Sequence, residues 1–121
     1  MTPVRLTWMR SSATRGAALA LLMRDIHHSQ AAKSDLVDIW VETDRQWGEA
    51  QADRYLDDID RALKGLIANP QMGSDCSDLL QGARKLITGR HLVFYEVDPD
   101  RIFVIRVLHQ SMDVPRHLRS S

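Results

Sequence analysis

The second half of the chain holds the side chains that could do chemistry. Cations occur there together with groups that can take up or release a proton, at positions Arg84, Lys85, Arg90, His91, Tyr95, Arg106, His109 and His117. Cleavage of RNA needs cations that stabilise the charged phosphate and groups that move protons to and from the reacting oxygens. The set would therefore suffice for a ribonuclease, but it does not distinguish one from a surface that binds a partner.

Several of these side chains also have an ordinary structural interpretation. Arg106 lies inside an apolar run, so it either contacts a target or partner, or packs its stem while its charged head meets a carboxylate. His109 and His117 suit structural hydrogen bonds better than catalysis. His27 and His28 would point to opposite faces of a strand, so the pair does not predict a metal site.

The charges are unevenly distributed along the chain although the net charge is zero. Residues 29–69 hold nine acidic and five basic side chains, whereas residues 84–121 hold seven basic and four acidic ones. An excess of three positive charges is small beside the basic face of a DNA-binding protein. We therefore expect no direct sequence-specific binding of nucleic acid.

Length and cysteine content limit the possibilities further. A chain of 121 residues fits one compact domain. Cys76 is the single cysteine, so it cannot form an internal disulfide or a cysteine zinc cluster. We expect a reduced, cytoplasmic protein that binds no cofactor and no metal.

Residues 1–22 read as an N-terminal extension to a domain that covers residues 23–121. The extension contains Arg5, Arg10 and Arg15, no acidic residue and no sustained periodicity. Its apolar run at residues 17–23 is too short to span a bilayer, which takes roughly 20 residues, and no cleavage site for secretion follows it. We expect either a flexible extension, which as a basic arm could touch nucleic acid, or a start-site artefact with Met23 as the true initiator.

Two amphipathic helices are predicted next. Ser29 is a good N-cap, and apolar side chains then recur every three or four residues as far as Gly48. The same pattern runs from Glu49 to Asn69, where Pro70 closes it. Two helices joined at one glycine form an antiparallel hairpin. Its core is expected to include Trp40, Trp47 and Tyr55.

Three strands are predicted after a loop at residues 70–82. They cover residues 83–88, 91–97 and 101–109, and residues 23–28 could add an edge strand. The fold class is therefore α+β, with a two-helix hairpin packed on a three- to four-stranded antiparallel sheet. A three-residue turn at 98–100 would place five side chains beneath the helices, and a four-residue loop would change the pairing. These five are Val93, Tyr95, Phe103, Ile105 and Val107.

The order of several short motifs resembles that of a known family. The motifs are Trp47-Gly48, Gln51-Ala52, Tyr55, Asn69-Pro70, Gly73, Gly82, Arg84, the stretch 89–95 and the ending 108–113, LHQSMD. In this order and spacing the chain resembles the ParE toxins of bacterial toxin-antitoxin modules, within the RelE/ParE superfamily. The resemblance extends over about residues 23–118.

The resemblance implies a small toxin without catalysis that acts by binding DNA gyrase. It also implies a ParD-like antitoxin that lays a helix on the hairpin and an extended stretch along the sheet, in a toxin-antitoxin hetero-oligomer. Such a segment would cover the apolar sheet face that the helices leave open. We expect the contacts with target or antitoxin to come from Arg84, Arg90, Arg106, His109, Met112 and Asp113.

Two alternatives remain open at this point. The RelE branch of the superfamily cuts mRNA on the ribosome, and the chemical inventory above does not exclude that activity. The acidic residues Asp75 and Asp78 before Arg84 and the HQSMD ending favour the ParE branch instead. The other alternative is a partner that has lost toxicity and acts with its antitoxin as a corepressor.

Overall fold

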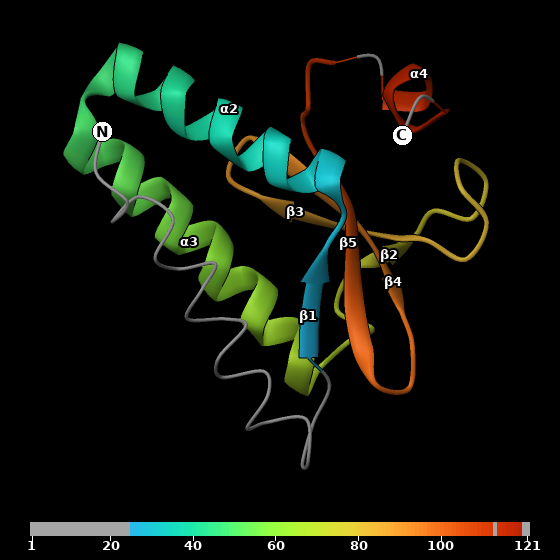
Figure 1. Ribbon diagram of the computed structural model, residues 1–121. Helices are drawn as coiled ribbons and strands as arrows, with labels where there is room; N and C mark the ends of the chain where they lie inside the picture. Colours follow the sequence, from blue (N-terminus) through green and yellow to red (C-terminus); the bar gives the residue numbers. More distant parts are fainter. Residues whose placement is uncertain (1–24, 113, 120–121) are drawn as a thin grey trace.

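The computed structural model describes residues 25–112 and 114–119 (Figure 1). The predicted extension at residues 1–22 and the site candidate Asp113 lie outside them. Along the chain the elements are β1 (Asp25–His28), α2 (Gln30–Trp47), α3 (Glu49–Ala68), β2 (Ser74–Asp75), β3 (Arg84–Thr88), β4 (His91–Val97), β5 (Arg101–His109) and α4 (Val114–Arg119).

The helical hairpin forms where the sequence predicted it. The Ser29 side chain accepts a hydrogen bond from the backbone N–H of Ala32 at 2.9 Å, which caps the start of α2. Gly48 has a φ of 94°, a conformation that glycine adopts without steric cost, and its N–H donates to the carbonyl of Asp44 at 2.9 Å. This single residue reverses the chain between α2 and α3.

The sheet is five-stranded and mixed, with the order β1-β5-β4-β3-β2. The predicted α+β class is confirmed, but the sheet has more strands than expected and is not wholly antiparallel. β1 pairs parallel to β5, and the helical hairpin, β2, β3 and β4 lie between these two strands along the chain. The short β2 pairs antiparallel with β3 and forms the other edge of the sheet. The hairpin covers one face of the sheet (Figure 1).

The register of the central hairpin differs from the three-residue turn expected. The N–H of Asp98 donates to the carbonyl of Arg101 at 2.8 Å, which closes a four-residue loop, and Val97 pairs with Ile102. A shift of one residue sends each side chain to the opposite face. A bulge between the pairs of Phe94 and Tyr95 shifts the register once more.

Two apolar clusters follow from this register, one on each face. The helix-facing cluster contains Val93, Tyr95 and Val107 as expected, with Ile102 and Val104 in the places predicted for Phe103 and Ile105. Phe103 and Ile105 instead belong to the outer cluster, where Leu118 of α4 and Cys76 help to cover Phe94 and Leu108. Part of the outer face is thus already covered by the chain itself.

Trp47 is the aromatic side chain whose predicted burial is wrong. It is 67% exposed, because the end of α2 projects beyond the sheet (Figure 1). Trp40 and Tyr55 do pack against the core, and the indole N–H of Trp40 donates to Asp53 of α3 at 2.9 Å. Among the described residues, no helix is both long enough and apolar enough to cross a membrane.

The loop after α3 is fixed by Tyr95. The Tyr95 hydroxyl donates to the carbonyl of Pro70 and accepts from the N–H of Gly73, both at 2.9 Å. A Cβ atom at Gly73 would lie 2.6 Å from the Tyr95 hydroxyl and 2.6 Å from the Lys85 carbonyl. The loop therefore approaches the sheet at a distance that only glycine permits.

The substitution Gly73→Ala tests this close approach. We expect it to lower the free energy of unfolding by about 1–3 kcal/mol, because the new methyl group must displace backbone of β3 or the Tyr95 ring. The matched control is Gly65→Ala in α3, where the Cβ would lie 3.5 Å from the end of Met72. That change should stabilise the helix by about 0.5–1 kcal/mol. Urea unfolding measures both, and an unchanged midpoint for Gly73→Ala would contradict the packing.

A second prediction concerns His28. Burial lowers the pKa of His28 to about 4, against the opposing charge of Asp60. Between pH 6.5 and 4 the unfolded chain binds a proton that the folded chain does not, so stability is lost as the pH falls through this window. The loss attributable to His28 should reach about 3 kcal/mol.

The variant His28→Gln should flatten this pH dependence, measured as the urea midpoint from pH 7.5 to 4. His27→Gln is the control, because His27 is 48% exposed and pairs with Asp25 at 3.2 Å. An identical slope for wild type and His28→Gln would show that His28 is not the responsible group.

Candidate functional site

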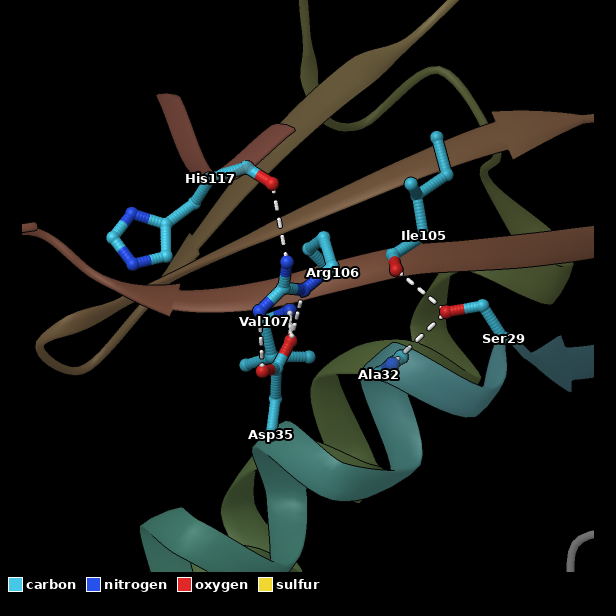
Figure 2. Close-up of polar contacts among 7 residues, drawn as sticks. All are labelled: Ser29, Ala32, Asp35, Ile105, Arg106, Val107 and His117. Atoms are coloured by element: carbon cyan, nitrogen blue, oxygen red, sulfur yellow. Dashed lines mark hydrogen bonds and ion pairs between the residues drawn. The ribbon is translucent and has the colours of Figure 1, made fainter. Parts of the chain in front are cut away.

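The exposed edge of β5 is completed by the side chains of Ser29, the N-cap of α2, and of Asp35 in α2 (Figure 2). β1 ends at His28, which pairs with Val104, so the next backbone groups of β5 lack a strand partner on that side. The Ser29 hydroxyl donates to the carbonyl of Ile105 at 2.6 Å, and the N–H of Val107 donates to the Asp35 carboxylate at 2.9 Å. The helix thereby satisfies backbone groups that a neighbouring strand would otherwise satisfy.

Arg106 belongs to the same set of contacts (Figure 2). Its guanidinium donates to the two oxygens of the Asp35 carboxylate, from Nε at 2.7 Å and from Nη2 at 2.8 Å. The third nitrogen, Nη1, donates to the carbonyl of His117 in α4 at 3.1 Å. The hydrogen bonds that Arg106 donates to Asp35 raise the pKa of Arg106 above its usual value. The side chains of Arg106 and Asp35 are 14% and 11% exposed. Of the two interpretations of Arg106, the geometry favours the structural one.

Arg84 is also committed to contacts within the chain. Its guanidinium donates to the carbonyl of Gly73 at 3.1 Å and to that of Gln71 at 3.2 Å. The Arg84 side chain therefore stabilises the loop after α3, to which the Tyr95 hydroxyl is also hydrogen-bonded. Arg84, Arg90 and Arg106 stay predicted contacts with target or antitoxin; in the structure Arg84 and Arg106 also bind groups within the chain.

The turn between β3 and β4 presents Arg90 differently. Its backbone N–H donates to the Tyr55 hydroxyl at 3.0 Å, and its carbonyl accepts from Gln110 at 3.0 Å. The residue is exposed, and its guanidinium has no hydrogen bond or ion pair with the described residues. A Cβ at the preceding Gly89 would lie 2.6 Å from the Tyr55 hydroxyl, so glycine is needed for this contact.

His91 and His109 are cross-strand neighbours at the same end of the sheet. Their rings meet edge to face with centroids 5.1 Å apart. The Tyr55 hydroxyl lies 2.6 Å from Nδ1 of His91. Burial lowers the pKa of His91 to about 4, with repulsion from His109 adding to the effect and Asp35 opposing it. His91 is therefore neutral at pH 7, and Tyr55 donates its proton to Nδ1.

His109 is tied to the segment that follows β5. Its Nδ1 accepts from the N–H of Ser111 at 3.1 Å and lies 2.7 Å from the Ser111 hydroxyl. Met112 follows with 44% of its surface exposed. Arg90, Ser111 and Met112 are exposed and His109 is half-buried, and the hydrogen bond from Gln110 to Arg90 joins the two segments. We call these four residues the sheet-end surface. Three of the six predicted site residues belong to it.

The sequence did not identify two residues of this arrangement. Tyr55 falls on the apolar stripe of α3 and was predicted as core, whereas its hydroxyl supports the β3–β4 turn. Ser111 lies in the HQSMD motif but was not selected, and its spacing of two from His109 was the available signal. In the described residues no three histidine, cysteine or acidic side chains converge to bind a metal.

The arrangement is better suited to binding than to proton transfer. The Nδ1 atoms of His91 and His109 are both engaged within the chain, by Tyr55 and Ser111. Arg90 supplies a cation without a partner among the described residues, and Met112 an adjacent apolar contact. These are the groups that recognise an acidic or polar protein surface.

Comparisons with known proteins agree with this geometry. The family model described as "ParE toxin of type II toxin-antitoxin system, parDE" matches residues 26–114. A protein of Mycobacterium tuberculosis (strain ATCC 25618 / H37Rv) called Toxin ParE1 is 44% identical over 91 residues, which cover 74% of this chain and 93% of that protein. Toxin ParE1 of Caulobacter vibrioides is 38% identical over 96 residues, covering 79% of this chain and 99% of that protein.

A solved structure shows the same fold. The structure described as "Chromosomal ParDE TA system from P. aeruginosa" matches with a TM-score of 0.62 and 20% identity, over 72% of this chain and 96% of that one. The family model covers most of the described residues, and the relatives are matched over nearly their whole length. The chain therefore belongs to the family of ParE toxins of type II toxin-antitoxin systems.

Proposed function

We propose that this protein inhibits DNA gyrase by binding it, and that a ParD-like antitoxin neutralises it. The observation that carries the proposal is the family match over residues 26–114. The sheet-end surface supports it, because Arg90 is an exposed cation without a partner among the described residues. Its turn is held by the Tyr55 hydroxyl and by Gln110, so little conformational entropy is lost when a partner binds there.

The same geometry supports a mechanism without catalysis. RNA cleavage would need one group to remove the proton of the 2′-hydroxyl and a second to protonate the leaving oxygen. His91 accepts from Tyr55 inside the fold, and His109 is bound to Ser111. The guanidinium of Arg84 donates hydrogen bonds to the carbonyl of Gly73, and that of Arg106 donates to the carboxylate of Asp35. Few of the groups in the chemical inventory are free to act on a phosphate.

The antitoxin would use apolar surface that the fold leaves exposed. Ile87 is 65% exposed on β3, and the strand continues past the short β2 without a further partner on that edge among the described residues. An extended segment that folds on binding can cover such a strip and pair with the strand. The matched structure, described as a ParDE TA system, is consistent with this partner. We also propose that toxin and antitoxin act in the cytoplasm.

A gyrase assay with Arg90→Glu tests the target and the surface together. The purified wild-type chain should inhibit supercoiling and promote cleaved DNA. Arg90→Glu should weaken this effect by about tenfold or more, because it reverses the free charge at the sheet-end surface. Arg61→Glu is the control, because Arg61 is exposed on α3 and Asp58 is its one ion-pair partner within the described part of the chain. Both variants should keep the wild-type melting temperature, since neither guanidinium supports the core.

The proposal has two separate ways to fail. If Arg90→Glu inhibited gyrase as strongly as wild type, the sheet-end surface would not be the contact surface, but gyrase would remain the proposed target. An absence of any effect of wild type on gyrase, together with ribosome-dependent cuts in mRNA, would replace the target by that of the RelE branch.

The ion pair of Asp35 and Arg106 calls for a stability measurement before any loss of toxicity is interpreted. Arg106→Met should lower the free energy of unfolding by about 3–5 kcal/mol, because Asp35 keeps a mostly buried charge without its partner. The double variant Asp35→Leu/Arg106→Met should regain part of that loss, although Val107 then lacks an acceptor. Urea unfolding of both variants gives the comparison. Equal stability of wild type and Arg106→Met would contradict the structural role.

A further inference from the structure

Two histidines lie side by side where β4 begins and β5 ends. His91 and His109 are cross-strand partners, and their rings meet edge to face with centroids 5.1 Å apart. They share the face of Val93 and Val107, which belong to the helix-facing cluster, because side chains alternate along each strand. Both histidines are partly exposed. We call His91 and His109 the histidine pair.

The contacts of His109 determine which of its ring nitrogens carries a hydrogen. Nδ1 of His109 accepts a hydrogen bond from the backbone N–H of Ser111 at 3.1 Å. Because a backbone N–H can only donate, Nδ1 has no hydrogen of its own. The Ser111 hydroxyl, 2.7 Å from the same Nδ1, is then a donor as well. The hydrogen of the His109 ring is therefore on Nε2.

The Tyr55 hydroxyl determines the tautomer of His91 in a similar way. This hydroxyl accepts from the N–H of Arg90 at 3.0 Å and lies 2.6 Å from Nδ1 of His91. Among the described residues, Nδ1 of His91 is the one acceptor bonded to the hydroxyl, so Tyr55 donates its hydrogen there. Since the pKa of His91 is lowered to about 4, the ring is neutral at pH 7 and carries its hydrogen on Nε2.

The histidine pair therefore offers two N–H donors and no acceptor to a group that approaches it. Within the described part of the chain, neither Nε2 atom has a hydrogen-bond partner. Arg90 precedes His91 in the sequence, is exposed and adds a positive charge at this end of the sheet. The charge of Asp35 acts on His91, but both Asp35 oxygens are bonded to Arg106. The group that fits two such donors beside a cation is an anionic oxygen group.

The charges around the pair favour a single carboxylate over a nucleic-acid backbone. The helical hairpin contacts His91 through Tyr55, and residues 29–69 hold nine acidic and five basic side chains. This excess of acid would repel a polymer that carries a negative charge at every phosphate. We propose that His91 and His109 form a carboxylate-binding site, in which their Nε2–H groups donate to an aspartate or glutamate side chain of a partner protein.

Tyr55 and Ser111 are the positioning residues of this site. Each holds one imidazole in the tautomer that leaves a donor at Nε2. The identification of the partner as gyrase rests on the proposed function, but the presence of the two donors does not.

Long-range 1H–15N NMR spectra of the full chain test the two donors directly. At pH 7.5 both rings should show the tautomer with its hydrogen on Nε2. Titration with sodium acetate at constant ionic strength should shift the Nε2 resonances of both histidines until the shift saturates. His27 is the control, because its Nε2 already lies 3.2 Å from the Asp25 carboxylate.

A short DNA duplex distinguishes the two sources of an anionic oxygen. At physiological salt the duplex should leave the Nε2 resonances of His91 and His109 unchanged, because the acidic hairpin repels it. Shifts of these resonances on addition of the duplex would assign the pair to a phosphate backbone and would overturn the choice of a protein carboxylate.

Two substitutions of His109 separate a contact with the partner from a role within the fold. His109→Asn keeps an acceptor near the position of Nδ1 for Ser111, but it removes the donor at Nε2. His109→Gln keeps an N–H near the position of Nε2 and loses the acceptor. Inhibition of gyrase should weaken by about tenfold or more in His109→Asn and by less in His109→Gln. His27→Asn on β1 is the control and should inhibit like wild type.

The same two substitutions at His91 repeat the comparison with Tyr55 in the place of Ser111. Melting temperatures of all variants show which of them keep the fold. A purely structural role predicts the opposite order, because asparagine preserves the contact within the chain and glutamine does not.

Three results would each overturn the proposal: a hydrogen on Nδ1 of either ring, no saturable shift with acetate, or a greater loss of inhibition with glutamine than with asparagine. The NMR measurements involve neither gyrase nor an antitoxin. If acetate binds while wild type has no effect on gyrase, the proposed function fails and the carboxylate site remains. If wild type inhibits gyrase while acetate does not bind, the carboxylate site fails and the proposed function remains.

Discussion

The carboxylate of Asp35 joins α2 to β5 directly and, through Arg106, to α4. One oxygen accepts from both Nε of Arg106 and the N–H of Val107, at 2.7 and 2.9 Å, and the other accepts from Arg106 at 2.8 Å. Because β1 stops at His28, β5 would otherwise expose an unsatisfied edge at the point where the helix crosses it. Arg106 extends the network to α4 through His117. Hairpin, sheet and C-terminal helix therefore meet at one side chain.

The parts of the fold that could be predicted are those whose signals are local. A cap at Ser29, a reversal at Gly48 and the 3.6-residue period define both helices from neighbouring residues alone. The register of β4 and β5 depends on one loop hydrogen bond and one bulge, which composition does not encode. The parallel pairing of β1 depends on a partner more than 70 residues away. Periodicity placed Trp47 on the core side of the helix, but it could not show that the sheet ends before that turn.

The candidate site shows the same division. The sequence identified the arginines, but it could not tell which of them would be neutralised within the fold. The partner of Arg106 lies 71 positions earlier, and the partners of Arg84 are backbone carbonyls of a loop. Arg90 could be anticipated as exposed because it follows Gly89 in a tight turn. The distinction between a structural and an available arginine is therefore a property of tertiary contacts, and residue type carries no information on it.

The sheet-end surface also depends on a helix that contributes no side chain to it. The Tyr55 hydroxyl accepts from the N–H of Arg90 and contacts His91, and the absence of a side chain at Gly89 lets the ring come this close. The β3–β4 turn is hydrogen-bonded to Tyr55 of α3 and to the backbone N–H of Gln110. The guanidinium of Arg90 therefore projects from a backbone that is fixed on both sides of the residue. A surface of this kind is sensitive to changes in the hairpin that never touch the target. Loss of activity in a hairpin variant thus identifies a contact residue only when the β3–β4 turn keeps its geometry.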